Sequence, residues 1–114
     1  MDKVEVVVRA LDDKLAKDIT VIDMQLASPM FDHFIIATAS NERLLGAIVD
    51  NVEDEMEKNG YALKRREGIR GSKWVLLDFG DCVVHVFDEE ERKAYNIEKL
   101  WADMPLVDID AYLN

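Results

Sequence analysis

The side chains that most often carry out chemistry are few in this sequence, and their spacing argues against a reaction centre. There are two histidines, His33 and His85, and one cysteine, Cys82. Neither histidine has a second histidine or a cysteine at metal-ligand spacing, so we expect no metal site. No serine stands in a nucleophile-elbow motif, and nothing near Cys82 indicates an activated thiolate. The sequence therefore predicts no catalytic residue and no cofactor, and His85 is interpreted as a structural, half-buried strand residue.

Three short motifs resemble catalytic or nucleic-acid-binding sequences. The triplet Asp78-Phe79-Gly80 occurs in protein kinases, but their other signatures are missing, and we interpret it as part of a hairpin. Residues 108–110 (Asp-Ile-Asp) would place two carboxylates on one side of a strand, as two-metal chemistry requires. We interpret them as a solvated tail. Residues 68–71 (Gly-Ile-Arg-Gly) match the loop that clamps nucleic-acid backbone in KH domains, although that loop joins two helices and this one leads into a strand.

Aromatic and acidic residues are interleaved in the C-terminal half. The aromatic residues concerned are Trp74, Phe87, Tyr95 and Trp101. Aromatic rings with a charged rim are typical of a protein-binding hot spot, although a single aromatic residue is more often part of a core. We expect about half of the four to be core residues. The pattern favours an interaction surface over a reaction centre.

Length and composition predict one domain with one hydrophobic core. The chain has 114 residues, of which 49% are hydrophobic, enough for one core and too few for two. We therefore expect a single domain over residues 1–114. No apolar run reaches the roughly 20 residues that span a bilayer, and the first residues lack a signal-peptide pattern. These features, with a single cysteine, predict a cytoplasmic protein without a membrane partner.

Charge is unevenly distributed along the chain. The formal net charge of −10 argues against a protein that wraps bare nucleic acid, DNA included, and favours a basic protein as the partner. Residues 58–73 hold six basic residues and one acidic residue, whereas the regions on both sides are acidic. Most single charges are expected only to solvate an exposed face, so the inference depends on the regional pattern.

Hydrophobic periodicity predicts the elements of the first half. Apolar residues at helical spacing predict a first helix, although three consecutive valines also support a strand. The repeated residues are Val4, Val7, Val8, Leu11 and Leu15. Strands are predicted over 18–24 and 33–38. A second helix is predicted over 41–58, with Ser40 or Asn41 as its cap and Asn59-Gly60 as its stop.

The second half is predicted to begin with a loop over 64–71, where charge and two glycines accumulate, preceded by a short strand around 61–63. Two strands, 74–79 and 82–87, flank Gly80-Asp81, a two-residue linker suited to a tight antiparallel hairpin.

A last helix is predicted to follow the hairpin. Asp88 and Glu91 have capping-box spacing, so the helix is expected to run to about Tyr95, with the tail from Asn96 packed back on the domain. The order of elements implies an α/β fold: a mixed β-sheet flanked by helices.

One long stretch resembles a known family. Residues 74–87 (WVLLDFGDCVVHVF) closely resemble the hallmark stretch of the Iojap-like ribosome silencing factors. The resemblance continues in Glu90-Glu91-Arg92, Tyr95, Leu100-Trp101, residues 32–38 (DHFIIAT) and Glu67-Gly68, and covers nearly the whole chain. The sequence departs from the family at Cys82, where an aliphatic residue is common, and at His33, where an aromatic residue is usual.

The resemblance implies a fold related to the nucleotidyltransferases but without their catalytic residues, and a protein that is not an enzyme. It implies binding to the large ribosomal subunit through its fourteenth ribosomal protein, which would sterically block joining of the small subunit and repress translation during nutrient limitation. An acidic domain suits a basic ribosomal protein by electrostatic steering. The basic segment 58–73 would then lie nearer ribosomal RNA as a secondary contact. The resemblance also implies a homodimer when the protein is free.

With that partner in view, a contact surface is predicted on and beside the hairpin and the helix after it. It consists of Trp74, Asp78, Asp81, His85, Phe87, Glu89, Glu90, Arg92 and Tyr95. Exposed aromatic area would anchor the partner and carboxylates would pair with its Lys or Arg side chains. Reversing Asp78 and Asp81 to Lys is therefore expected to abolish binding without unfolding the protein. Two alternatives remain open. One is a small RNA-binding or ribosome assembly module that uses residues 58–73, and the other is a nucleotidyltransferase, degenerate or active.

Overall fold

Five strands form one mixed sheet in the computed structural model, which describes residues 1–68 and 71–113. The strands are β1 (Lys17–Asp23), β2 (His33–Ala39), β3 (Arg65–Glu67), β4 (Trp74–Asp78) and β5 (Cys82–Asp88). Their order across the sheet is β1-β2-β5-β4-β3. β2 and β5 are parallel and the other neighbours are antiparallel. The predicted mixed α/β sheet is confirmed.

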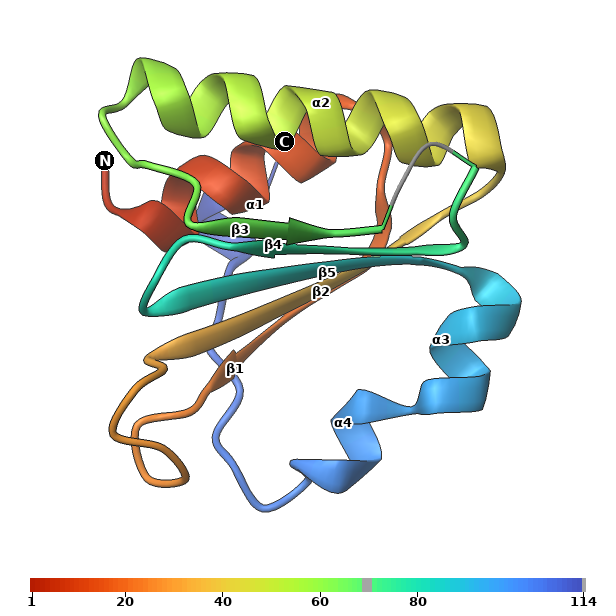
Figure 1. The fold of residues 1–114 in the computed structure, drawn as a ribbon. Coiled ribbons are helices and arrows are strands. Elements are labelled where there is room, and N and C mark those ends of the chain that lie inside the picture. The colour runs from red at the N-terminus through yellow and green to blue at the C-terminus, as the bar shows by residue number, and fades with distance from the viewer. Residues whose placement is uncertain (69–70, 114) are drawn as a thin grey trace.

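Two helices, α1 (Lys3–Asp13) and α2 (Glu42–Lys58), cover one face of the sheet (Figure 1). Both bury one apolar stripe against β2 and β5, in a core that includes Val8, Leu11 and Ile48. Asn41, rather than Ser40, caps α2, because its side chain accepts a hydrogen bond from the backbone N–H of Leu44. The predicted first helix is correct, but Leu15 lies beyond its end with φ of 64° and an exposed side chain.

The opposite face of the sheet is covered by later parts of the chain. α3 (Glu89–Tyr95) and α4 (Ile97–Leu100) descend from the end of β5, and the following segment returns to β1 (Figure 1). Beyond β1 the chain reaches the first face again, where a short 3-10 helix, Asp110–Tyr112, contacts α1. A smaller core on this face contains Ile22, Met24, Ile36 and Phe87, packed against half-buried rings. The predicted α3 is confirmed, since the Asp88 side chain accepts from the N–H of Glu91.

The hairpin of β4 and β5 has the predicted turn. The N–H of Phe79 donates to the carbonyl of Cys82 at 2.9 Å, which leaves Gly80 and Asp81 as the two central residues. Gly80 has φ of +97°, and hairpin turns of this length require a positive φ at that position. The turn therefore fixes the register in which Trp74 faces Phe87 across the two strands.

The region between α2 and β4 differs from the prediction. Residues 61–64 form no strand, whereas three residues of the predicted loop, Arg65–Glu67, pair with β4 as the edge strand β3. All three are exposed, so this edge lacks the apolar alternation from which a strand is predicted. Residues 69 and 70 of the KH-like motif lie outside the described part of the chain.

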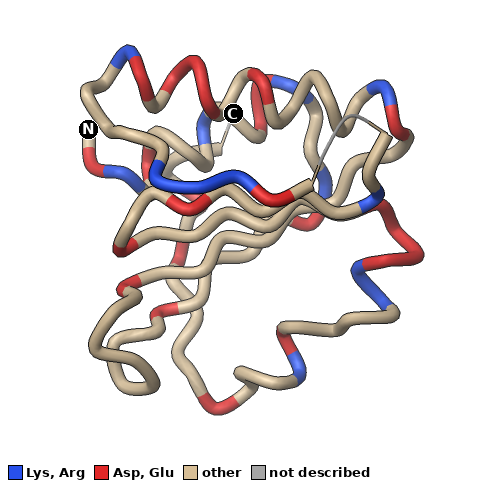
Figure 2. The backbone as a smooth tube through the Cα atoms, viewed as in Figure 1, with Lys and Arg blue, Asp and Glu red and all other residues tan. Residues whose placement is uncertain are grey.

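The two edges of the sheet differ in what lies beside them. At β1, the tail pairs with the strand through an isolated bridge of Leu106 with Ile22 and a 2.9 Å bond from the N–H of Val107 to the carbonyl of Val21. The tail thus packs back as predicted, although Leu106 is itself exposed. The β3 edge instead bears a row of Lys and Arg residues, whereas acidic residues dominate the start of α3 (Figure 2). No helix in the described residues has the length and apolar character to cross a membrane.

Candidate protein-binding face

A row of aromatic rings crosses the sheet on the face opposite α1 and α2. Trp74 of β4 stacks on Phe87 of β5, with ring centroids 5.1 Å apart and planes at 20°. The ring centroid of Tyr95, at the end of α3, lies 4.5 Å from that of Trp74. The row continues through His85 to Phe34 of β2, 5.2 Å away. The alternation of β5 puts His85 and Phe87 on this face, and the antiparallel register brings Trp74 beside them.

His85 is held inside this row as a neutral imidazole. The indole Nε1–H of Trp74 donates to Nδ1 of His85 at 3.3 Å. Burial lowers the pKa of His85 from 6.5 to about 4, because the charged ring would lose its hydration. Since Nδ1 accepts, the proton of the neutral ring is on Nε2, which has no hydrogen-bond partner among the described residues. His85 thus fixes the orientation of Trp74, and it is buried rather than half buried as predicted.

Only part of the predicted aromatic surface is accessible. Phe87 is 0% exposed and His85 5%, so neither can touch a partner on this folded surface. Their burial argues against a direct role in the predicted contact surface. Tyr95 is 55% exposed, and Trp74 is half buried above Phe87. The accessible aromatic area is therefore an edge of Trp74 together with Tyr95.

The carboxylates Asp78 and Asp81 lie at the turn of the hairpin. Asp78 accepts a hydrogen bond from the N–H of Gly80 at 2.8 Å, which stabilises the turn. Asp81 forms a 2.6 Å ion pair with Lys3, and the same ammonium donates to the carbonyl of Phe79. Both carboxylates thus have partners within the chain: Asp78 acts inside the turn, and Asp81 connects the turn to α1 through Lys3.

Glu89 and Glu90 lie at the other end of β5, on the first turn of α3, and are exposed. A strand of seven residues separates them from the hairpin turn, a distance of about 20 Å. The predicted residues therefore divide into two groups rather than one surface. Trp74, Tyr95 and the two glutamates form one group, which we call the α3 face, and the aspartates form the other.

Arg92 is the third predicted contact residue whose side chain points inward. It is 13% exposed, and its guanidinium is occupied by four hydrogen bonds within the chain. The sequence pattern around Arg92, three glutamates followed by Arg-Lys, looks like a solvated helix face. This inward orientation argues against a direct contact of Arg92 with a partner.

Other apolar residues near this face were not predicted as site residues. Phe34 and Trp101 meet edge to face, with centroids 6.3 Å apart. Beyond them, Leu26, Met30, Leu100 and Leu106 are exposed by 71% or more. The β1–β2 loop, α4 and the tail that carry them lie on the same side of the sheet (Figure 1). The alternation of β2 could have placed Phe34 beside His85, but only if β2 was known to pair with β5.

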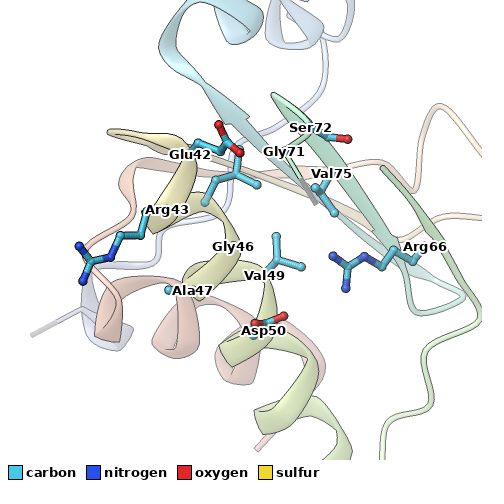
Figure 3. Close-up of a pocket in the computed structure, with 11 residues that line it drawn as sticks. Glu42, Arg43, Gly46, Ala47, Val49, Asp50, Arg66, Gly71, Ser72 and Val75 are labelled. Atoms are coloured by element: carbon cyan, nitrogen blue, oxygen red, sulfur yellow. The ribbon is translucent and has the colours of Figure 1, made fainter. Parts of the chain in front are cut away.

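A cleft of about 710 Å³ lies on the other side, between the first turns of α2 and the start of β4 (Figure 3). Its charged lining is mixed, with Glu42 and Asp50 opposed by Arg43 and Arg66. In the described part of the chain, no group of three or more His, Cys, Asp or Glu residues could hold a metal ion. Asp108 instead accepts from the N–H of Asp110, so these two carboxylates sit in a turn and not along a strand.

Comparisons with known proteins agree with one another. The sequence profile of a family described as "Ribosomal silencing factor during starvation" matches residues 1–114. The chain is 44% identical over 105 residues to Ribosomal silencing factor RsfS of Bacillus subtilis, covering 92% of this chain and 89% of that protein. A crystal structure from Bacillus halodurans is similar, with a TM-score of 0.81 and 38% sequence identity. The similarity covers 92% of this chain and 95% of that one. A more distant relative is Protein Iojap, chloroplastic, of Arabidopsis thaliana, which is 31% identical over 101 residues. The match covers 89% of this chain and 42% of that protein.

Proposed function

This chain belongs to the family of ribosomal silencing factors, and from that membership we propose that it binds the large ribosomal subunit and blocks joining of the small subunit. The contact is with the fourteenth protein of the large subunit, and steric exclusion lowers translation during nutrient limitation. The protein acts by binding and is not an enzyme. The observation that carries the proposal is the family match over the whole chain.

The α3 face supports a protein partner. It combines accessible aromatic area at Trp74 and Tyr95 with the exposed carboxylates of Glu89 and Glu90. Aromatic residues with a charged rim are the usual composition of an interface hot spot, and the acidic rim complements a basic ribosomal protein. We assign the α3 face as the primary contact surface of this protein.

Sedimentation of purified subunits tests the function directly. Small and large subunits are mixed with and without the protein, and every gradient fraction is probed for it. Comigration with the large subunit and loss of the joined-ribosome peak are expected. Comigration with an undiminished joined peak would contradict subunit exclusion, and failure to comigrate would contradict ribosome binding.

Tyr95→Ala tests the aromatic anchor. Truncating an exposed aromatic anchor at an interface costs about 1–3 kcal/mol, so the Kd for the large subunit should rise about 5- to 150-fold. Leu15→Ala is a matched control, because Leu15 is equally apolar, is 73% exposed and lies at the end of α1. Equal affinity of both variants in a filter-binding assay would remove Tyr95 from the interface.

The two acidic groups require separate variants. Asp81→Lys would place a second positive charge beside Lys3, and Asp78→Lys would remove the acceptor for the N–H of Gly80. Charge reversal would therefore also disturb the turn. Asn at both positions removes the charge and keeps an oxygen acceptor. We expect the Asp78→Asn, Asp81→Asn protein to retain affinity within about threefold, since exposed pairs contribute little, whereas Glu89→Gln with Glu90→Gln weakens binding. The reverse result would assign the contact to the hairpin turn.

The free protein is proposed to form a homodimer. The exposed residues Leu26, Met30, Leu100 and Leu106 provide apolar area that a second copy of the chain could cover. Sedimentation equilibrium should then give a mass near twice 13.1 kDa at micromolar concentration. A strictly monomeric mass for the wild-type protein would contradict the dimer.

A secondary contact with ribosomal RNA is supported by the exposed β3 edge. Lys64 has no acidic partner among the residues that the structure describes, whereas Arg65 pairs with Glu67 and Arg66 with Glu53. Partial neutralisation makes β3 a weak phosphate-binding surface, so RNA is secondary and a stand-alone RNA-binding module is the second candidate function. Binding of isolated RNA with a steep salt dependence, at the affinity of the whole subunit, would favour that second function.

A further inference from the structure

α3 carries the exposed part of the α3 face, yet few contacts hold it in place. None of its seven residues is buried. Packing of an apolar stripe is what normally fixes a helix of this length, because isolated short helices are marginal in water. The position of α3 must therefore depend on a small number of specific contacts. The observed contacts are Tyr95 against Trp74 and Phe87 at the end of the helix, Arg92 in its middle, and an exposed 3.8 Å ion pair of Glu89 with Lys17 in its first turn.

The guanidinium of Arg92 spans two strands and the next helix. Nη1 donates to the carbonyl of Asp18 at 2.7 Å and to Oγ1 of Thr38 at 2.8 Å, and Nη2 donates to Oγ1 of Thr20 at 3.2 Å. Nε donates to Oε1 of Glu98 in α4 at 2.8 Å. One side chain thus connects α3 to β1, β2 and α4, and it is largely withdrawn from solvent.

A distortion of β1 presents one of these acceptors. Between the pairs Lys17 with Thr38 and Thr20 with Ile36, two residues of β1 oppose one residue of β2, which defines a β-bulge. Asp18, the first bulged residue, has φ of 51°, a conformation that costs free energy for a residue with a side chain. The carbonyl of this strained residue is the one that accepts from Arg92.

We propose that Arg92 is a positioning residue, which holds α3 on the bulge of β1 and the end of β2 so that Tyr95 and the glutamates are presented to a protein partner. That Arg92 fixes α3 stands on the hydrogen bonds alone. That this fixation serves partner binding rests on the proposed function. Lys cannot replace Arg here, because a single ammonium lacks the planar fork that reaches acceptors on two strands and α4 together.

Thr38 offers an independent test of the same contact. Its side chain is buried, 2% exposed, and its hydroxyl receives the Nη1 bond. Thr38→Val keeps the branched shape and loses the hydroxyl, whereas Thr38→Ser keeps the hydroxyl and loses the methyl group. If Thr38 acts only by packing, Thr38→Ser should loosen α3 more than Thr38→Val does. If its hydroxyl accepts the Arg92 bond, Thr38→Val should loosen α3 more.

Hydrogen–deuterium exchange of the full-length free protein measures the position of α3 without the ribosome. In Arg92→Met and Arg92→Lys, amides of α3 and α4 should exchange at least about tenfold faster, with those of β2 and β5 unchanged. Arg9→Met is the control, since Arg9 forms a part-buried i,i+4 pair with Glu5 on α1 and lies over the ring of Tyr112, on the face of the sheet opposite α3. Unchanged α3 exchange in Arg92→Met would overturn the proposal, as would a uniform increase over the whole chain in both Arg92 variants and Thr38→Val.

Comparison of Thr38→Val with Thr38→Ser distinguishes a hydrogen-bonding role of Thr38 from a packing role. Faster α3 exchange in Thr38→Val than in Thr38→Ser supports the proposal, and an equal or opposite order overturns it. Affinity for the large subunit is then measured on the same folded variants, with a loss of about tenfold expected for Arg92→Lys. Loosened α3 with unchanged affinity would overturn the partner-binding half of the proposal, and failure of the wild-type protein to bind would overturn the proposed function alone.

Discussion

The pair of half-buried Trp74 and buried His85 is the residue-scale feature on which the α3 face depends. The indole donates to Nδ1 of His85 and stacks on Phe87, so its orientation is fixed before any partner arrives. A preorganised aromatic anchor loses less conformational entropy on binding than a mobile one. His85 therefore supports the α3 face from beneath, although it is itself buried.

Neutral burial of His85 makes stability depend on pH. Its pKa falls from 6.5 to about 4 on folding, so the unfolded chain binds the proton more readily between these values. The stabilising contribution is complete above pH 6.5 and is lost as the pH falls towards 4. The free energy of unfolding in urea should drop by about 2 kcal/mol between about pH 7.5 and pH 5. His85→Gln, which still accepts from Trp74, should lose much less, and an equal loss in both proteins would contradict the assignment.

Cys82 should react only slowly with thiol reagents in the folded protein. It is 1% exposed, and its pKa is raised to about 12, first by burial and then by the charge of Asp81. Thiol reagents attack the thiolate, so a disulfide reagent at about pH 8 should react at least about 100-fold more slowly with the native chain than with the urea-unfolded chain. Rapid labelling of the native protein would show that the β2–β5 end of the sheet opens.

At the scale of elements, Gly68 determines how the chain reaches β4. Its φ is +98°, and a Cβ there would lie 2.6 Å from the carbonyl oxygen of Trp74. That oxygen belongs to the backbone of a sheet strand, which cannot move aside cheaply. The glycine thus lets the backbone at the end of β3 lie directly against the start of β4, where the aromatic anchor begins.

Gly68→Ala and Gly60→Ala form a matched pair. Both glycines have positive φ, but nothing lies within 4 Å of a Cβ at Gly60. Gly60→Ala should cost only the conformational strain, about 1–2 kcal/mol. Gly68→Ala adds an overpacking cost, for a total of about 2–4 kcal/mol in urea denaturation. Equal destabilisation would show that the chain near Trp74 relaxes to admit the methyl group.

At the scale of the molecule, opposite charges occupy different parts of the surface. The basic residues of β3 line one edge of the sheet, and the glutamates of α3 lie at the carboxyl end of β5 (Figure 2). Overall the chain carries a formal charge of −10. This arrangement favours approach to a basic protein with α3 foremost, while like-charge repulsion limits nonspecific adhesion to RNA.

Electrostatic steering should be visible in association rates. The rate constant for binding to the large subunit should fall as salt rises, and Glu89→Gln with Glu90→Gln should flatten that dependence and slow association about threefold or more. Asp54→Asn with Glu57→Gln removes the same charge from exposed positions of α2 and serves as the control. Equal slopes for the two double variants would indicate that net charge, and not the α3 face, steers association.

The sequence alone determined the features that depend on local spacing. The apolar stripe of α2, the Gly80-Asp81 turn and the capping pair of Asp88 and Glu91 each set an element through contacts within a few residues. The mixed sheet followed from their order, and the family followed from residues 74–87.

Only the tertiary structure decided which side chains remain accessible. Burial of Phe87 and His85 depends on strand neighbours distant in sequence, and the inward turn of Arg92 depends on acceptors 54 to 74 residues away. β3 likewise exists because β4 offers it partners, since its own three residues have no apolar alternation. Local periodicity specifies an element and one of its faces, whereas long-range packing determines whether that face meets solvent, a core or an ion-pair partner.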